Sequence, residues 1–550
     1  MKKQRFLCCS CNKKFFAETS IVNKHCFISN SVKYAIALDL KHKISTKIYT
    51  HITKNSTLIL NESAYFYCRF RVSVEKIEYV YYNETNSEKQ VMNMLLELYP
   101  EKEYQTFKSI GASGAWWAQI VGNWSHIDNE SGKEVRDRIA ELLYNKETGI
   151  GLNVYRYNIG GGSKHSGKGE FSQPARATEC FEKAKGEYDW NRDSSAVYMM
   201  KKCVENGADE VIFFVNSPIE RLTKNGMTHN KKHQLFHENI AKKNYKDFAK
   251  YCLDVTEHFL SEGMPIKYLS PINEPIWVWN GGQEGCFYRP RSVKNVFKVF
   301  ASELDNRPAL KNLKLSGAES GDLRWFNKSY TRNLLKDKNV RKYLDGVDVH
   351  SYCLPLPLPV EIPFLNDRLG FVKRFRKWMD KHYPDVPVIM SEWTHMKGGR
   401  DYSMDSALVT ATTMYEDFTL LNAVSWQHWI AVSEVDYCDG LIYINLEDKS
   451  FEITKRYYVT GNFTKYIKPG SKRIEAKSDD KDVLVVAFKD SERTTVVLIN
   501  NSDEEKSVSL PFEKEILISV TDKDNNLTES RVKTDKLNIT SKSVTTMVII

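Results

Sequence analysis

Short apolar runs alternate with longer stretches of helical periodicity in the middle of the chain. In residues 245–262, apolar side chains recur at intervals of three and four, as in a helix with one face packed on a sheet. Weaker forms of this pattern occur at 291–304, 369–383 and 404–422. The runs that we interpret as strands are 107–111, 152–158, 210–216, 266–272, 313–317, 347–350, 386–391 and 423–428. Eight strands alternating with helices predict an α/β fold, a closed (β/α)8 TIM barrel with its chemistry at the C-terminal strand ends.

An open, doubly wound parallel sheet is the alternative for this region. A dinucleotide-binding sheet of that kind has a Gly-x-Gly-x-x-Gly turn after its first strand. Here Gly160, Gly161 and Gly162 follow the second strand-like run, and they lack that spacing. The pattern therefore favours the closed barrel.

The two flanks of this region are rich in short β-type runs. They occur at 33–39, 57–60, 65–74 and 76–82 before it, and at 483–488, 494–499, 506–510, 515–521 and 543–549 after it. We expect an attached β-sandwich domain built from the C-terminal tail together with N-terminal strands. The predicted divisions are a featureless or poorly ordered leader (1–30), sandwich strands (31–104), the (β/α)8 barrel (105–455) and the C-terminal sandwich (456–550).

The composition is that of a globular protein of more than one domain. Of 550 residues, 41% are hydrophobic and 27% charged. The 79 Lys and Arg exceed the 70 Asp and Glu by nine, a mild excess that is spread over presumed helices and not gathered with aromatic residues. The longest apolar runs are too short to cross a bilayer. We therefore expect no nucleic-acid partner, no membrane span and a monomer.

The cysteines are mostly isolated, which argues against a disulfide scaffold. One N-terminal group is the exception, because Cys8 and Cys11 have the CxxC spacing of a zinc site. No second CxxC completes the pattern, so we expect no metal, although the role of the group stays open. Its members are Cys8, Cys9, Cys11 and Cys26, with His25 beside the last.

The location of the protein also stays open. Basic residues at 2, 3 and 5 could begin an export signal, but polar residues at 10 and 12–14 interrupt the apolar segment that such a signal needs. A cytoplasmic protein and one exported by an unrecognised or truncated signal are both compatible with this sequence.

Two glutamates occupy unusual positions. Glu274 follows the fourth predicted strand and Glu392 follows the seventh. A carboxylate at the end of a buried apolar strand is costly, because its charge loses hydration there. Two such groups on one barrel rim form the pair that breaks a glycosidic bond, one as proton donor and the other as the ionised partner. Either glutamate alone would be interpreted as one member of a salt bridge.

Aromatic and polar side chains accompany these glutamates at the strand ends. Indole rings pack against the CH faces of sugars, and fixed polar groups bind hydroxyls. The tryptophans expected to contact a sugar are Trp117, Trp277, Trp426 and Trp429, and the polar groups on the same rim are Arg156, Asn158, His350 and Tyr352.

Six motifs in order resemble glycoside hydrolase family 30, over about residues 105–550. This is a family of retaining enzymes with a (β/α)8 barrel and an attached β-sandwich. The motifs are 113–117 (SGAWW), 153–161 (NVYRYNIGG), 273–275 (NEP), 282–286 (GQEGC), 391–393 (SEW) and 426–429 (WQHW). Within the family they are most similar to the endo-β-1,6-galactanase-like members.

The resemblance implies a role for each matching residue. Glu274 would be the general acid/base and Glu392 the nucleophile, with Asn273 bonded to the sugar 2-hydroxyl. Arg156 and Tyr352 would support the nucleophile. Trp277, Trp426 and Trp429 would line the sugar subsites, and the resemblance calls for no metal or organic cofactor.

Other functions stay open at this stage. One is a family 30 enzyme that acts on a β-glucan, a β-fucoside or a xylan in place of β-1,6-galactan. Another is a non-catalytic carbohydrate-binding protein on the same barrel, although both glutamates are present. The third is a nucleic-acid or zinc-dependent protein, suggested by the basic balance and the N-terminal cysteines. Endo or exo action is not predicted by the sequence.

Overall fold

A computed structural model describes residues 93–550, except for 167–170, 172, 235 and 354–366, together with four short N-terminal strands. These strands form two antiparallel pairs, β1 (Gln4–Leu7) with β2 (Lys14–Ala17) and β3 (Tyr49–Thr50) with β4 (Leu58–Ile59). They belong to a compact unit, Met1–Gln90, that is separate from the unit Val91–Ile550. The cysteine group at 8–26 and the strands predicted at 33–39, 65–74 and 76–82 lie outside the described residues.

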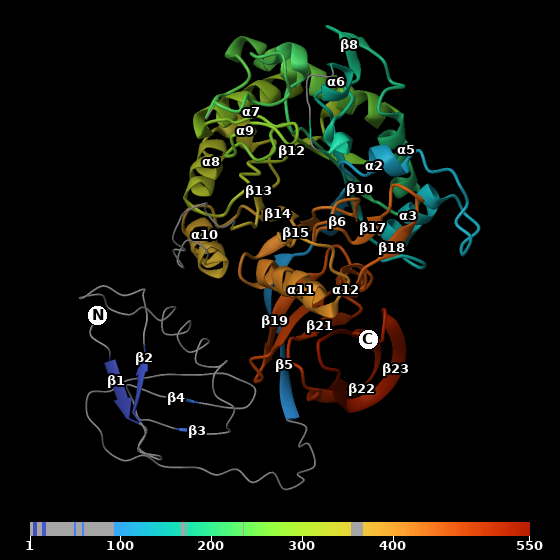
Figure 1. Cartoon of the computed structure of the whole chain (residues 1–550), viewed down its shortest axis with the longest axis vertical. Helices are drawn as coiled ribbons and strands as arrows, with labels where there is room; N and C mark the ends of the chain where they lie inside the picture. The colour runs from blue at the N-terminus through green and yellow to red at the C-terminus, as the bar shows by residue number, and fades with distance from the viewer. Residues whose placement is uncertain are drawn as a thin grey trace. The chain divides into compact units, whose positions relative to one another are not determined.

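The predicted barrel is present in the second unit (Figure 1). Its strands pair in parallel in the order β12-β11-β10-β7-β6-β15-β14-β13. Isolated parallel bridges, Leu315 with Leu344 and Ala318 with Asp348, join the region of β12 to the region of β13 and close the ring. The strands are β6 (Ser109–Ser113), β7 (Val154–Asn158), β10 (Glu210–Phe214), β11 (Ile266–Ser270), β12 (Lys314–Leu315), β13 (Val347–His350), β14 (Val388–Trp393) and β15 (Ala423–His428).

Helices surround this ring. In α6 (Tyr245–Ser261), Phe248, Tyr251, Val255 and Phe259 are buried, as the three-and-four spacing predicts. The others are α2 (Ala118–Val121), α3 (Val135–Tyr144), α4 (Ser163–Ser166), α5 (Ser194–Glu205), α7 (Pro290–Leu304), α8 (Trp325–Leu335), α9 (Lys338–Arg341), α10 (Arg368–His382), α11 (Met404–Thr419) and α12 (Lys455–Thr464).

The helix predicted at 404–422 is shorter than expected. It begins after Ser403, whose hydroxyl caps the amide of Ser406, and it ends at Thr419. Asn422 has a φ of 59°, in the left-handed region, so the chain has already turned toward β15.

Small strands decorate the loops between these elements. They are β8 (Glu182–Ala184) with β9 (Glu187–Tyr188), and the three-stranded sheet of β16 (Val432–Ser433), β17 (Ile442–Ile444) and β18 (Phe451–Ile453). The second group follows β15 and therefore lies at the end of the barrel where its strands end.

A second sheet forms the β-sandwich, in the order β23-β22-β24-β21-β20-β19-β5, with a further pairing of β22 to β5. Among the described residues, the N-terminal contribution to it is one long strand, β5 (Asn93–Thr106). The runs predicted at 506–510 and 515–521 belong to a single strand, β22 (Lys506–Thr521), with a register shift between Ser509 and Lys514. The other strands are β19 (Lys472–Ser478), β20 (Val483–Lys489), β21 (Thr494–Asn500), β23 (Thr528–Ile539) and β24 (Ser543–Ile549).

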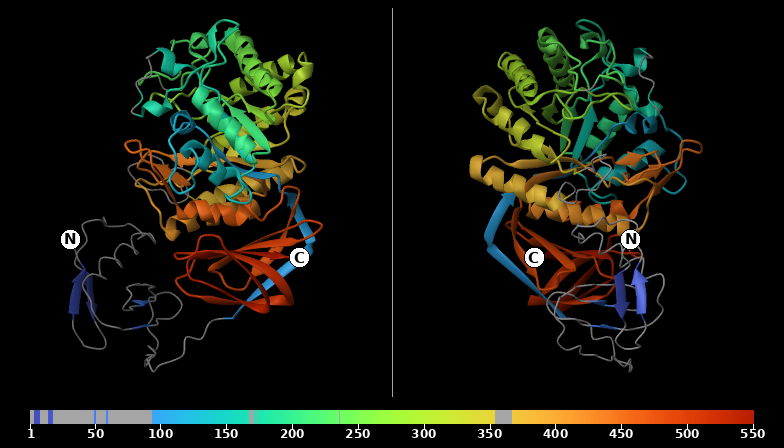
Figure 2. Two further views of the ribbon diagram at one scale, coloured as in Figure 1. Left: turned by 90° about the vertical axis from the view of Figure 1, so that its right-hand side faces the viewer. Right: turned by 60° about the vertical axis from the view of Figure 1, so that its left-hand side comes forward.

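The barrel and the sandwich share an interface made by α11 and α12 (Figure 2). From α12, Tyr457 donates a hydrogen bond to the carbonyl of Leu142 in the barrel, and Asn462 donates one to the carbonyl of Ser519 in the sandwich. One helix therefore ties the two layers together. No helix in the described part of the chain is long and apolar enough to span a membrane.

Candidate active site

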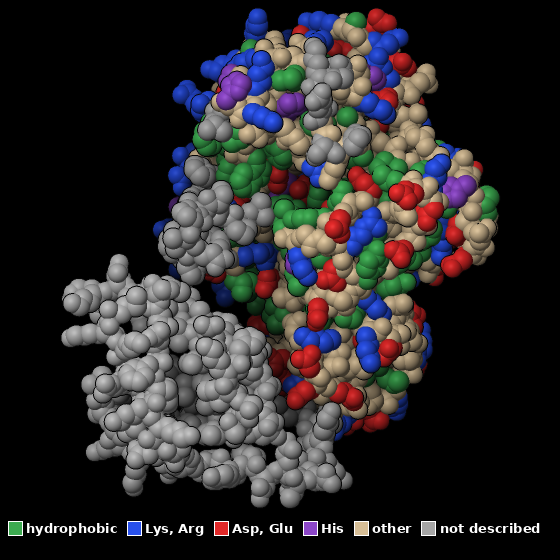
Figure 3. Space-filling model, in the orientation of Figure 1, with side chains coloured by type: hydrophobic (Ala, Val, Ile, Leu, Met, Phe, Trp, Pro, Cys, Tyr) green, Lys and Arg blue, Asp and Glu red, His purple; other side chains and the backbone are tan. Residues whose placement is uncertain are grey.

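The two predicted glutamates converge with His350 at the C-terminal ends of their strands. Glu274 follows β11, His350 ends β13, and Glu392 lies in β14. One carboxylate oxygen of each glutamate and a ring nitrogen of His350 lie within 4.8 Å of one another, and all three side chains are buried. His350 Nδ1 is 2.8 Å from Glu274 Oε1 and 3.6 Å from Glu392 Oε1. Figure 3 shows a hollow within the barrel on the side that faces the viewer, bordered by apolar side chains.

Arg156 is the cationic centre of this group. It lies in the middle of β7, and its guanidinium donates to Glu392 Oε2 at 2.7 Å and to Asn273 Oδ1 at 2.9 Å. It also contacts both carboxylate oxygens of Glu319 at 3.3 Å. The group stacks over the ring of Phe214 at 3.8 Å. A buried arginine with several acidic partners fixes their geometry as well as their charge.

A chain of amides continues from Arg156 across the ends of three strands. Asn273 Nδ2 donates to Asn216 Oδ1 at 3.0 Å, and Asn216 Nδ2 donates to Asn158 Oδ1 at 3.1 Å. All three side chains are buried. Each amide is thereby oriented, and Asn273 keeps a second N–H for another partner.

The surroundings distinguish the two glutamates electrostatically. Burial raises the pKa of Glu274 well above its ordinary value, and the charge of Glu392 raises it further. Burial also raises the pKa of Glu392, but Arg156 and a hydrogen bond from Tyr352 oppose that rise. Burial, with the charge of Arg156, holds the pKa of His350 well below its usual range. The arrangement thus favours a protonated Glu274, an ionised Glu392 and a neutral imidazole.

Glu319 is a buried acid that the sequence analysis missed. It follows β12, and its carboxylate accepts a hydrogen bond from Ser270 at 2.6 Å in addition to its contacts with Arg156. Its backbone carbonyl accepts from the amide of Glu274 at 2.9 Å. Both residues have φ near 44°, so two matching turns place these acids side by side. The signal was an acid just after the fifth strand, the same signal that identified Glu274.

Glu284, in the predicted 282–286 motif, is a second buried acid with a structural task. Its carboxylate accepts hydrogen bonds from the amides of Gly161 and Ser163 and from the Ser163 hydroxyl, at 2.5 to 3.1 Å. It therefore clamps the loop after β7 to the loop that carries Glu274.

The tryptophans predicted to bind a sugar separate into two groups. Trp277 and Trp429 are half-buried at the strand ends. Trp117 and Trp426 are completely buried, and their indole N–H groups donate to the Ser113 carbonyl and to Asp417. In this structure those two rings are in the hydrophobic core and have no face open to a sugar. The residue of the 113–117 motif that packs against Trp429 is Trp116, with ring centroids 5.1 Å apart.

The positions of Glu274, His350 and Glu392 would also suit a divalent metal ion, since each offers one ligand atom. The direct contacts between these side chains and to Arg156 provide an alternative means of holding them.

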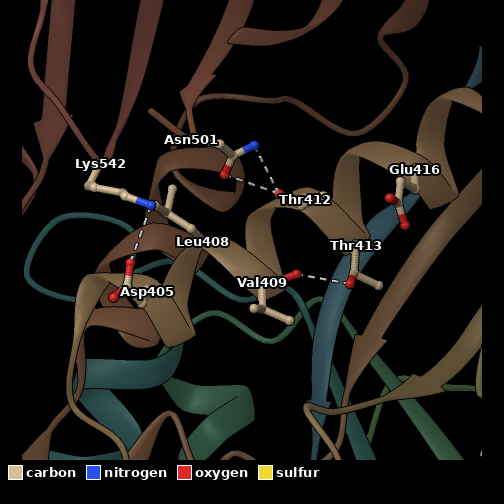
Figure 4. A pocket seen from close by; sticks show the side chains of 8 residues that line it. All are labelled: Asp405, Leu408, Val409, Thr412, Thr413, Glu416, Asn501 and Lys542. Carbon is tan, nitrogen blue, oxygen red and sulfur yellow. Dashed lines mark hydrogen bonds and ion pairs between the residues drawn. The ribbon is translucent and has the colours of Figure 1, made fainter. Parts of the chain in front are cut away.

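A separate cavity of about 360 Å³ lies between α11 and the sandwich (Figure 4). It is lined by Leu408, Val409 and Thr412 from the helix and by Asn501 and Lys542 from the sandwich loops. None of the predicted catalytic residues borders it, so it is not part of the candidate active site.

Comparison with known families accounts for both layers of the fold. The model of O-glycosyl hydrolase family 30 matches residues 93–351 and 385–443. The chain belongs to glycoside hydrolase family 30. The model of the family 30 beta sandwich domain matches residues 470–547. The resemblance seen in the motifs is thus confirmed, and the protein is an O-glycosyl hydrolase.

Individual relatives agree with the family. An endo-beta-1,6-galactanase of Hypocrea rufa is 25% identical over 442 residues, which are 74% of this chain and 81% of that one. A conserved exported protein from Bacteroides fragilis has a similar structure, with a TM-score of 0.72, 24% identity, and coverage of 83% of this chain and 100% of that one. The catalytic domain of family 30 xylanase C from Talaromyces cellulolyticus has a TM-score of 0.63 at 16% identity, over 84% of this chain and 100% of that one. The two structures share the fold with this family 30 member.

Proposed function

We propose that this family 30 enzyme hydrolyses β-glycosidic bonds with retention of configuration, by double displacement, and that β-1,6-galactan is its substrate. The observation that carries the proposal is the proximity of Glu274 and Glu392, with carboxylate oxygens within 4.8 Å. Retaining enzymes hold their two carboxyl groups about 5–5.5 Å apart, whereas inverting enzymes leave about 6.5–9.5 Å for a water molecule. This spacing supports retention.

In the first step, Glu392 attacks the anomeric carbon while Glu274 gives its proton to the glycosidic oxygen. The bond between the sugar and the leaving group breaks, the leaving group departs as an alcohol, and the sugar becomes esterified to Glu392. In the second step, Glu274 takes a proton from water, whose oxygen attacks the same carbon and releases Glu392. Burial raises the pKa of both acids, but hydrogen bonds from Arg156 and Tyr352 oppose the rise at Glu392, which suits this division of work.

The neighbouring residues hold these groups in place. Arg156 and Tyr352 donate to the Glu392 carboxylate and keep one oxygen aimed at the sugar. The free N–H of Asn273 is available to the 2-hydroxyl, a contact that strengthens as positive charge develops on the ring. Trp277 and Trp429 would support the sugar faces, and Asn158 would orient the amide chain.

The choice of β-1,6-galactan as substrate is based on the sequence similarity to an endo-beta-1,6-galactanase. The endo-beta-1,6-galactanase is 25% identical over most of both chains, a distance at which specificity can differ. β-Glucans, β-fucosides and xylans are the alternative substrates for the same chemistry.

The test is a panel of β-1,6-galactan, β-1,6-glucan, a β-fucoside and glucuronoxylan, with product sizing and proton NMR of the first anomer released. We expect β-1,6-linked galactose units to be released first as the β-anomer. Initial release of the α-anomer would contradict retention. Cleavage of another polymer alone would contradict the choice of substrate.

A further inference from the structure

Three buried polar atoms in loops that follow barrel strands have no hydrogen-bond partner among the described residues. They are Nε1 of Trp116, Nε of Arg176 and Oδ1 of Asp439. A buried donor or acceptor without a partner costs free energy, and such atoms concentrate where a ligand or water completes the bonding. Two donors and one acceptor in one region form the complement of a hydroxyl group, which both accepts and donates.

Aromatic contacts connect this region to the catalytic centre. Trp116 meets Trp429 edge to face at 5.1 Å, and Trp429 meets Phe214 at 6.4 Å. Phe214 lies under the guanidinium of Arg156, which donates to Glu392. In addition, the amide of Trp429 donates to the carbonyl of Trp393, the residue after the nucleophile. These contacts connect the region to Glu392, the residue that would carry the glycone in the proposed reaction.

Arg176 covers this region from the loop after β7. Its guanidinium lies over the ring of Trp116 at 4.9 Å, and Nη1 donates to the carbonyl of Gly282 at 3.3 Å. Gly282 belongs to the loop that carries Glu274, so Arg176 bridges two loops of the barrel mouth. Its Nε is buried and has no hydrogen-bond partner among the described residues.

Asp439 lies in the loop between β16 and β17 and is 8% exposed. Its backbone carbonyl accepts from His428 Nε2 at 2.8 Å and from Thr394, two residues beyond Glu392. Its side chain receives a hydrogen bond from Ser433, which leaves Oδ1 unpartnered. Burial raises the pKa of Tyr352, the tyrosine that bonds to Glu392, and the charge of Asp439 adds to that rise.

Charge indicates what kind of group fits between these residues. Arg176 lies over Trp116, Trp116 packs against Trp429, and the amide of the next residue, Ile430, donates to the carbonyl of Asp439 at 3.4 Å. Burial lowers the pKa of Arg176, while the charges of Glu434 and Asp439 raise it. In the described part of the chain, neither acid forms an ion pair with Arg176. One arginine with two acids is poorly suited to an anionic ligand, because the carboxylates would repel it. A neutral hydroxyl can bridge from the arginine or indole to the aspartate without this penalty.

We propose that Asp439, Arg176 and Trp116 form a specificity site that binds a hydroxyl of a neutral sugar unit on the glycone side of Glu392. This inference rests on the proposed glycosidase function and deepens it. A pocket that is built to hydrogen-bond a hydroxyl discriminates strongly against an analogue that lacks it, because the polar groups stay buried and unpaired. The site therefore selects neutral, fully hydroxylated glycans and disfavours uronic acids.

The experiment is a double-mutant cycle in which one change is a substitution in the protein and the other is the removal of a hydroxyl from the substrate. We would measure kcat/KM of the wild type, D439A and D439N on β-1,6-galactobiose and on its 3-, 4- and 6-deoxy forms in the non-reducing unit. D436N is the matched control, since Asp436 lies on the same loop and bonds to the amide of Arg400. Thermal melts of every variant test whether it is folded.

One deoxy position should reduce the wild-type kcat/KM by at least about 10-fold, and D439A should show the same loss on the intact sugar. D439A should lose nothing further on that deoxy sugar, and D436N should behave as the wild type does. Losses that multiply for every deoxy position would overturn the proposal. A gain of 10-fold or more on a galactobiose whose terminal unit is oxidised to the uronic acid would overturn the selection for neutral sugars.

A failure of the hydroxyl-binding site can be distinguished from a failure of the proposed glycosidase function. The same cycle can be measured as binding, by calorimetry with galactobiose and its deoxy forms, in the E392Q background. If the wild type cleaves no β-glycoside but the binding cycle shows the coupling, the hydroxyl site stands and the catalytic proposal fails. If cleavage occurs and neither cycle shows coupling, the hydroxyl site fails alone.

Discussion

Arg156 donates a 2.7 Å hydrogen bond to Glu392, whereas Glu274 contacts the imidazole of His350. This difference between two acids that are equally removed from water decides which one carries the charge. An arginine at bonding distance stabilises an ionised carboxylate, and a neutral ring gives much less support. The proposed roles of nucleophile and acid follow from it.

The pH dependence of kcat/KM should be bell-shaped, with both limbs at higher pH than the ordinary pKa of a glutamate. The rising side reports ionisation of Glu392 and the falling side reports loss of the proton from Glu274, and burial raises the pKa of both. Because the proton donor is missing in E274Q, that variant should lose the falling side on substrates with good leaving groups, such as nitrophenyl glycosides. An unchanged bell in E274Q would assign the proton to another residue.

Gly321 should be essential to the position of the acid. Its φ is +81°, and a Cβ there would lie 2.7 Å from Nε1 of Trp277 and 3.1 Å from the carboxyl carbon of Glu274. We expect G321A to lower kcat/KM by about 10- to 100-fold, since a displacement near 1 Å is that costly in an active site. Steady-state kinetics and thermal melts would measure both effects.

The matched control is Gly186, in the turn between β8 and β9. Its φ is +77°, and a Cβ there would meet nothing within 4 Å. G186A should show the backbone strain, roughly 1–2 kcal/mol of stability, with unchanged kinetics. Equal kinetic losses in the two variants would mean that strain alone explains G321A.

Glu284 should contribute to stability through its carboxylate. In E284Q a single acceptor oxygen replaces two, and an amide donor faces the N–H groups of Gly161 and Ser163. Leaving buried donors unpaired costs about 1–3 kcal/mol, so urea unfolding should show a loss of that order. E97Q, the same change at an exposed site, should stay within about 0.5 kcal/mol of the wild type. Equal stability of E284Q and the wild type would contradict the clamp.

Removal of metal should leave the enzyme active. Two carboxylates and a water molecule complete the proposed reaction, although Glu274, His350 and Glu392 lie close enough to bind an ion. After dialysis against a chelator, kcat on the best substrate of the panel should be unchanged. A loss that a divalent ion restores would instead identify these three side chains as metal ligands.

The sequence predicted those parts of the fold that depend on local pattern. The strands at 347–350 and 423–428 were predicted to the residue, because apolar and polar side chains alternate along the first and through the middle of the second, as in a β-strand. β12 has only two residues and β23 is mostly exposed, so neither has a pattern of apolar residues that would show where the strand begins and ends. Their bounds follow from pairing with the neighbouring strands. The register shift that joins the predicted 506–510 and 515–521 runs is likewise a property of the pairing.

The candidate site was predicted unevenly for a physical reason. Glu274 and Glu392 are recognisable as charges beside buried strands, and their motifs carry the family resemblance. The difference between Trp116 and Trp117 depends on which way each indole points, a three-dimensional property that neighbouring identical residues do not reveal. Asp439 lies in a loop with no recognisable motif, and its importance appears only when its oxygen is found buried without a partner.

The most direct test of the central claim is to trap the covalent intermediate. A 2-deoxy-2-fluoro-β-galactosyl fluoride slows both steps but the second more, so the glycosyl-enzyme accumulates and can be located by peptide mass spectrometry. We predict one fluorogalactosyl group per chain, attached to the peptide that contains Glu392, and no labelling of E392Q. A label on any other residue, Glu274 included, would contradict the account.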